Sequence, residues 1–263
     1  MLDFGYVFAG FAVGLIVGLT GVGGGSLMTP ILIFFFGVKP YLAVGTDLLF
    51  ASVTKAGGTL SLARQRLVPW RVVGTLSAGS LPAAGLMLWW LHRVGPSSPE
   101  VQHLMTFTLG IALLLTAAAM LVKAIRGPRA AAQPDVADHV DATRGRHPGL
   151  TVLLGAVIGV LVTLTSVGAG AIGVSVLLLL YPRLPLPRII ASDIAYAVPL
   201  TLVAGLGHAS LGSVDVPLLF TLLAGSLPGI WLGSRLVTRT PERIIRSALS
   251  LLLAWAGSKL VLI

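Results

Sequence analysis

Two glycine-rich stretches interrupt apolar runs of the chain, and their type and spacing suggest a chemical task. The first is Thr20-Gly21-Val22-Gly23-Gly24-Gly25-Ser26, and the second is Thr165-Ser166-Val167-Gly168-Ala169-Gly170-Ala171. Glycine tolerates positive φ and close approach to the backbone, so we expect each stretch to break a membrane helix. Lipid cannot satisfy the freed N–H and C=O groups, which must therefore face protein or a watery cavity. N–H groups at a helix start form an anion site without any charged side chain.

Two acidic residues occupy matched places in the halves of the chain, in Thr46-Asp47 and Ser192-Asp193. A carboxyl group inside a membrane segment is costly and is a functional candidate by default. Because a carboxylate repels an anion, we interpret Asp47 and Asp193 as proton-coupling groups. The alternative, that each only accepts local hydrogen bonds, stays open. Thr46 and Ser192 either donate to substrate oxygens or bond back to their own helices.

Lys55 and His208 are the other ionisable candidates. Lys55 lies inside an apolar segment, eight residues after Asp47, and its counterpart in the second half is Thr201. It either attracts the anion, pairs with an aspartate, or extends to the membrane interface. His208 either shuttles protons or has a structural role.

The composition indicates a membrane protein. The chain has 263 residues, of which 56% are hydrophobic and 10% charged, whereas soluble domains have about 25% charged residues. The basic residues fall in short gaps between apolar runs, which is typical of membrane loops and argues against nucleic-acid binding. The absence of cysteine excludes disulfides and thiolate metal sites. No basic stretch follows Met1, so we expect the first apolar segment to be retained.

Ten helical segments are predicted, and they divide the chain into three parts. The parts are an N-terminal membrane repeat (1–125), a polar linker (126–149) and a C-terminal membrane repeat (150–263). Segments 25–38 and 168–182 are shorter than the roughly 30 Å hydrocarbon core requires, so they either are re-entrant or cross the bilayer tilted. The segments are 4–20, 25–38, 41–63, 69–91, 101–124, 150–165, 168–182, 188–209, 214–236 and 243–262.

The two membrane parts are internal repeats. Gly10 and Gly14 recur as Gly155 and Gly159, an offset of 145, and 78–82 (Ala-Gly-Ser-Leu-Pro) recurs unchanged at 224–228, an offset of 146. Since five segments is an odd number, the second copy should lie upside down relative to the first. With the linker in the cytoplasm, fourteen of the eighteen Lys and Arg residues fall on the cytoplasmic side, as expected for inner-membrane proteins. Both termini are then external. The predicted fold is an all-α polytopic helical bundle of two inverted five-segment repeats with paired broken or re-entrant helices.

Several of these motifs resemble the TauE/SafE sulfite exporter family. They are the stretch 21–26, Val44-Gly45-Thr46, Gly207-His208, the stretch 212–215 and 225–229 (Gly-Ser-Leu-Pro-Gly). The resemblance covers nearly the whole chain and implies a bacterial inner-membrane transporter of small sulfur-containing anions such as sulfite, sulfonates or thiosulfate. This sequence differs from the expected pattern in having aspartate at 47 and 193 and alanine at 169 and 171.

We therefore predict a secondary transporter, an exporter that works by alternating access with or without proton coupling. The expected partners are a small anion and the lipid bilayer, without nucleic acid, cofactor, metal or catalytic residue; the sequence leaves open whether a homo-oligomer forms. The substrate-binding candidates are Thr20, Gly21, Gly23, Gly24, Gly25, Ser26, Thr46, Lys55, Thr165, Ser166, Gly168, Gly170 and Ser192, with Asp47 and Asp193 for proton coupling.

Two other functions use some of the same residues. A cation or metal-ion transporter would use Asp47 and Asp193 as ligands. An intramembrane hydrolase would pair Ser26 or Ser210 with His208, but the chain has no Gly-x-Ser-Gly element and no third orienting group.

Overall fold

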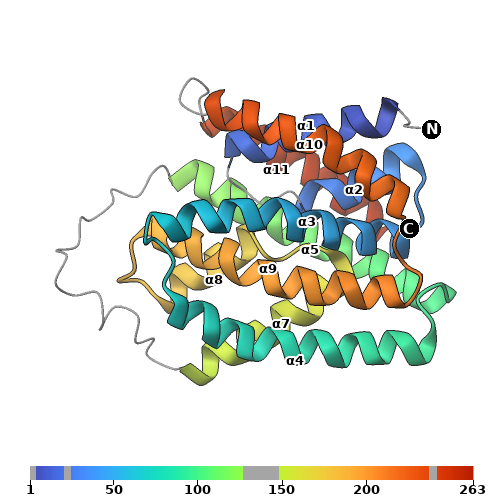
Figure 1. Cartoon of the computed structure of the whole chain (residues 1–263), viewed down its shortest axis with the longest axis horizontal. Coiled ribbons are helices and arrows are strands. Elements are labelled where there is room, and N and C mark those ends of the chain that lie inside the picture. Colours follow the sequence, from blue (N-terminus) through green and yellow to red (C-terminus); the bar gives the residue numbers. More distant parts are fainter. Residues whose placement is uncertain (1–3, 21–24, 127–147, 237–241, 263) are drawn as a thin grey trace.

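The computed structural model describes residues 4–20, 25–126, 148–236 and 242–262, and in these residues it is a bundle of ten helices without strands (Figure 1). The predicted all-helical fold is confirmed, and the helix ends lie within a few residues of the predicted ones. The helices are α1 (Phe4–Thr20), α2 (Gly25–Phe36), α3 (Pro40–Arg64), α4 (Trp70–Val94), α5 (Pro99–Arg126), α7 (Pro148–Thr165), α8 (Ala171–Leu180), α9 (Leu186–Ser210), α10 (Val216–Leu236) and α11 (Glu242–Val261).

Five of these helices are long and apolar enough to cross a membrane: α4, α5, α7, α9 and α10. Helix α3 is equally long but less apolar, because it contains Asp47, Lys55 and several glycines. Helices α2 and α8 have 12 and 10 residues, which correspond to about 18 and 15 Å. Each is therefore too short to cross the hydrocarbon core alone, as predicted.

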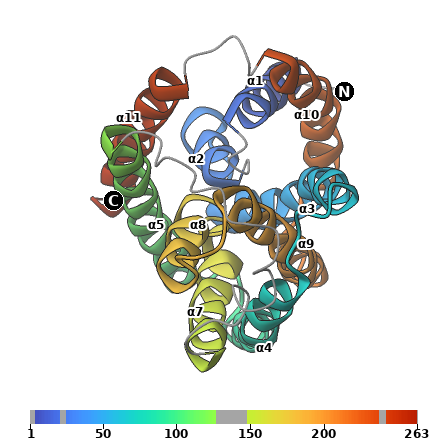
Figure 2. The same ribbon diagram turned by 90° about the vertical axis from the view of Figure 1, so that its left-hand side faces the viewer.

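The helices of the two halves are paired with each other rather than among themselves. Helix α1 packs mainly on α10 and α7 mainly on α4, while α3 packs on α9 and α5 on α11. Figure 2, which looks along the bundle, shows these four pairs, with α2 and α8 lying among them. Exchanging α1–α5 for α7–α11 maps the set of pairs onto itself, as expected of two related copies. That the copies lie in opposite orientations across the membrane stays a prediction.

Glycines at the repeated positions allow close backbone contacts between the halves. The Cα of Gly10 lies against the Leu222 carbonyl, and its repeat partner Gly155 lies against the carbonyl of Leu76. In the same way Gly79 meets the Val152 carbonyl. A Cβ atom at any of these positions would collide with the facing backbone. These glycines thus permit tight helix crossing, as in other membrane bundles with small residues at the interface.

We predict that Gly79→Ala destabilises the protein because its new methyl group has to push the Val152 backbone away. Overpacking of this kind costs about 1–3 kcal/mol. The measurement is the free energy of unfolding in mixed micelles. Gly74→Ala on the same helix is the matched control, since no atom lies within 4 Å of its new Cβ. Equal stability of the two variants would contradict the role of Gly79.

Candidate functional site

The second glycine-rich stretch interrupts the chain between α7 and α8, as predicted. Helix α7 ends at Thr165 and α8 begins at Ala171, three residues later than the predicted start at 168. The difference arises because Ser166, Gly168 and Gly170 have φ values of 58°, 132° and 137°, which no right-handed helix allows. We call residues 166–170 the second break.

The carbonyl groups around the second break are largely taken by partners from other elements. The Thr163 carbonyl lies 2.9 Å from Nε2 of His208 on α9, and the Ala169 carbonyl accepts a hydrogen bond from Nζ of Lys55 on α3 at 3.3 Å. The Gly168 and Gly170 carbonyls accept from the first N–H groups of α8 at 3.0 and 2.8 Å. The break therefore presents few free acceptors.

The backbone N–H groups of residues 168–170, in contrast to these carbonyls, lack hydrogen-bond partners among the described residues. Within the described parts of the chain, no acceptor is bonded to the backbone N–H groups of Gly168, Ala169 or Gly170, and no side chain caps the start of α8. The Ser166 hydroxyl is buried and also has no hydrogen-bond partner among the described residues. Since a buried donor without a partner costs about 1–3 kcal/mol, this cluster is suited to an acceptor supplied from outside.

Asp47 faces this region from the first half. It is fully buried on α3, and Thr29 of α2 donates a hydrogen bond of 2.5 Å to its Oδ2. The Ser166 hydroxyl lies close to the same carboxyl group. Asp47 Oδ1, however, forms no hydrogen bond within the described residues. The second break and the acid of the first half thus share one polar region inside an apolar bundle.

Lys55 joins this region to the acid of the second half. Its side chain is 7% exposed, and its charge interacts with Asp193 and, less strongly, with Asp47. Lys55 therefore lies inside the bundle near both aspartates, and its role in anion binding stays a prediction. Its donation to the Ala169 carbonyl, across 114 residues of sequence, was not predictable from the sequence.

Asp193 contacts α8 much as Asp47 contacts α2. A Cβ atom at Gly173 would collide with Asp193 Oδ1 and would lie 3.3 Å from the Tyr196 hydroxyl. Glycine at this position of α8 therefore lets the α9 carboxyl group reach the short helix. In both halves the acid of a long helix faces the short helix that follows the glycine-rich stretch.

The hydroxyls of Thr46, Ser192 and Thr165 all form hydrogen bonds within the protein. Thr46 Oγ1 accepts a hydrogen bond of 3.0 Å from the Asp215 N–H, and Ser192 Oγ donates one of 2.8 Å to the Arg188 carbonyl in its own helix. Thr165 Oγ1 accepts from the Val167 N–H at 3.1 Å and so shapes the second break. Substrate binding by these three residues stays a prediction.

The first glycine-rich stretch gives less information. Residues Gly21, Gly23 and Gly24, and the side chains of Thr20 and Ser26, lie outside what the structure describes, as does Gly25 beyond its place at the start of α2. The roles assigned to these six residues therefore stay predictions.

Sequence reasoning did not single out Thr29 and Tyr196. Neither residue type recurs in the other half, where the counterparts at the offsets 145 and 146 are Val174 and Phe50. Their relevance depends on which helix faces which, and the pattern of a single helix does not contain that information.

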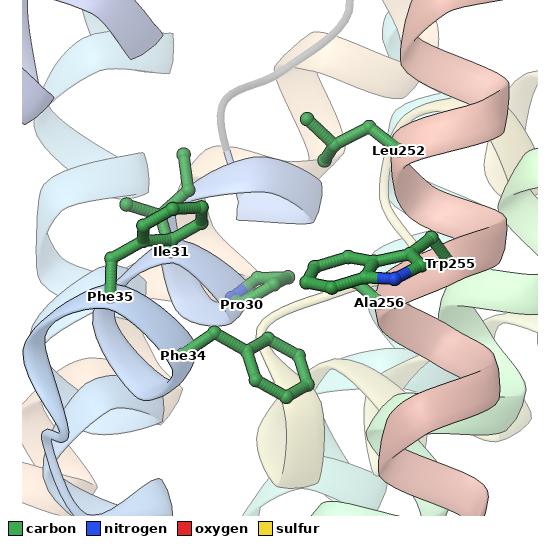
Figure 3. A pocket seen from close by; sticks show the side chains of 7 residues that line it. All are labelled: Pro30, Ile31, Phe34, Phe35, Leu252, Trp255 and Ala256. Carbon is green, nitrogen blue, oxygen red and sulfur yellow. The ribbon is translucent and has the colours of Figure 1, made fainter.

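An apolar pocket of about 300 Å³ lies elsewhere, between α2 and α11. Figure 3 shows its lining of Pro30, Ile31, Phe34 and Phe35 on one side and Leu252, Trp255 and Ala256 on the other. The surface of this pocket is entirely apolar. An anion would lose its hydration there without compensation, so this pocket is not the candidate site.

Comparison with known proteins identifies the family. The family model described as "Sulfite exporter TauE/SafE" matches residues 6–260. The chain belongs to this family. Its full-length relatives include the probable membrane transporter protein YjnA of Bacillus subtilis, which is 35% identical over 97% of this chain and 98% of its own length. The probable membrane transporter YdhB of the same organism is 24% identical over 94% and 95%. No solved structure matches the chain at a comparable significance.

We predict that Thr29→Val lowers stability because it removes the donor to Asp47 Oδ2 and leaves a buried carboxyl group short of a partner. Losing one partner of a buried hydrogen bond costs about 1–3 kcal/mol. The free energy of unfolding in mixed micelles is the measurement. Thr29→Ser retains the hydroxyl and should remain closer to the wild-type protein. If the valine variant is as stable as the serine variant, the hydrogen bond contributes nothing.

Proposed function

We propose that this member of the TauE/SafE family is a secondary transporter of the inner membrane that exports a small sulfur-containing anion, of the sulfite, sulfonate or thiosulfate class, by alternating access. The observation that supports this most strongly is the one-sided hydrogen bonding of the second break, where the carbonyls of residues 167–170 have partners and the N–H groups of residues 168–170 have none among the described residues. Only an acceptor-rich ligand complements such a surface, and oxyanions of sulfur consist of acceptor oxygens around one centre. No nucleophile or catalytic arrangement is part of the proposal.

In this proposal, the anion is held by the N–H groups of residues 168–170, by the Ser166 hydroxyl and by the positive charge of Lys55. The first glycine-rich stretch, from Thr20 to Ser26, supplies the matching half of the site. The two inverted copies then move relative to each other so that the site opens to one side of the membrane at a time. Broken helices that meet inside a bundle are the usual binding element of transporters built this way.

The charges near the site favour proton coupling. Asp47 and Asp193 together carry two negative charges when ionised, and Lys55 compensates for one of them. The remaining negative charge would repel an anion, whereas uptake of one proton by a carboxyl group makes the set neutral. Proton binding and anion binding therefore support each other, and Asp47 and Asp193 are the coupling groups.

The cation-transporter reading is less consistent with the same contacts. A metal ion between the two acids would meet the ammonium group of Lys55, which already interacts with both carboxyl groups. Among the described residues, no group of three or more His, Cys, Asp and Glu side chains could hold a metal. The two readings differ in their consequence for Asp47→Asn, which should abolish binding of a cation but only uncouple transport of an anion from protons.

The orientation proposed from the basic residues places both termini outside and the 126–149 linker inside. In Figure 1, α1 begins and α11 ends on the right, while α5 ends and α7 begins on the left. This arrangement supports a linker on the opposite side from the termini.

We predict that a single cysteine at position 137, in the linker, reacts with a membrane-impermeant thiol reagent only after the cells are opened. A cysteine at Ser97, in the exposed turn between α4 and α5, should react in intact cells. The chain has no native cysteine, so the labelling has no background. Reaction of both positions from the same side would contradict the proposed orientation.

We predict that Lys55→Met raises the sulfite concentration for half-maximal uptake into proteoliposomes by at least about tenfold. A hydrogen bond to a charged group contributes about 1.5–3 kcal/mol, and each 1.4 kcal/mol changes affinity tenfold. Radiolabelled sulfite and thiosulfate are the probes, with and without a pH gradient. Lys39→Met removes an exposed lysine at the start of the same helix and should leave uptake unchanged.

Lys55→Arg retains the charge and should fall between the methionine variant and the wild-type protein. If the wild-type protein shows no saturable flux of either anion under any gradient, the proposed function is wrong. If Lys55→Met transports with unchanged half-saturation, the anion does not bind near Lys55.

A further inference from the structure

His208 is a buried ionisable residue that the proposed anion contacts do not use. It lies in the last turn of α9 and is 0% exposed. Its Nε2 atom lies 2.9 Å from the Thr163 carbonyl oxygen. A carbonyl oxygen can only accept a hydrogen bond, so Nε2 carries the proton and donates it. The tautomer of the ring is thereby fixed by its partner.

The Thr163 carbonyl is available to His208 because of the second break. In a continuous helix, this carbonyl would accept a hydrogen bond from the N–H group of Val167. Here the Val167 N–H donates to the hydroxyl of Thr165 instead, at 3.1 Å. The carbonyl released by the end of α7 is therefore bonded by a side chain from α9.

We infer that His208 is a positioning residue for the anion site, because it fixes the end of α7 from which the second break departs. This inference rests on the proposed function. With the Thr163 carbonyl held by His208 and the Ala169 carbonyl held by Lys55, the backbone is fixed on both sides of Ser166 and Gly168. These two anchors keep the N–H donors of residues 168–170 in one orientation before the anion arrives.

The same histidine connects the second break to the acid of the first half. A Cβ atom added at Gly45 would lie 3.1 Å from the Cβ of His208 and would collide with the carbonyl oxygen of Ser213. The Ser213 N–H donates to the His208 carbonyl at 2.9 Å. Gly45 lies two residues before Asp47 on α3. His208 thus holds the end of α7, the loop after α9 and the start of α3 in a fixed relation.

The other ring nitrogen supports a positioning role over a proton relay. Nδ1 of His208 is buried and has no hydrogen-bond partner within the described residues. A relay would need a partner at both nitrogens, whereas a positioning residue needs only one. The hydrogen bond is also specific to the second half, because the repeat counterpart of His208 is Leu62 (208 − 146), which has no donor.

The test compares three variants in full-length protein. Glutamine places an amide donor near the position of Nε2, whereas asparagine places it near the position of Nδ1, and alanine has no donor. We expect His208→Asn and His208→Ala to raise hydrogen exchange of the amides in 164–174 at least tenfold, with a similar rise in half-saturation for radiolabelled sulfite. The maximal rate at saturating sulfite should stay within about threefold. His208→Gln should stay close to the wild-type protein in both measurements.

His92→Ala, which alters an exposed histidine at the end of α4, is the control and should change neither measurement. The inference is overturned if exchange in 164–174 is unchanged in His208→Asn, if asparagine restores function and glutamine does not, or if exchange rises without loss of sulfite affinity. Should the alanine variant fail to fold, the comparison of glutamine with asparagine decides. Hydrogen exchange does not depend on transport, so absence of both sulfite and thiosulfate flux in the wild-type protein would disprove the proposed function separately from the hydrogen bond.

Discussion

The requirement that every main-chain polar group in hydrocarbon has a partner governs this structure. Long helices meet the requirement with their own hydrogen bonds. Where glycine-rich sequence interrupts a helix, the polar groups need partners from elsewhere. At the second break, the carbonyl groups of residues 167–170 have partners, while the three successive N–H groups of residues 168–170 have none among the described residues. In the proposed function, this imbalance lets a neutral backbone bind an anion, because the N–H half of each peptide group is left without an acceptor while the carbonyl half is already hydrogen-bonded.

The buried charges depend on the same arrangement. An ionised side chain is expensive away from water unless it is paired and hydrogen-bonded, and Asp47 is accompanied by Thr29 and by the charge of Lys55. These groups come from α2 and α3, yet they face a loop of the other half. The polar centre therefore exists only when both halves are assembled. Glycine contacts between α1 and α10 and between α4 and α7 allow the halves to pack closely enough for this.

Much of the fold could be predicted because it depends on local information. Apolar runs bounded by charged or proline-containing gaps predicted the ten helices, and recurring glycines predicted the duplication. Asp47 and Lys55 could be singled out from the sequence because an ionisable side chain inside a membrane segment is costly. Their partners did not follow, since the contacts of Lys55 with Ala169 and of His208 with Thr163 arise from how α3, α7 and α9 cross. The start of α8 was misplaced because the number of break residues with positive φ depends on tertiary contacts of the loop.

The exchanged pairing of α1 with α10 has a consequence for biosynthesis. The glycine-lined face of α1 fits a helix whose residues follow some 200 positions later, since Gly10 meets Leu222. When the first five helices of a nascent chain have entered the bilayer, the helices they mainly pack against have not yet been made. Partly assembled chains of this kind are prone to misassembly. During that interval the small-residue faces of α1 and α4 lie open to other membrane helices. The helix pairs of the bundle can therefore form only once the second half has been inserted.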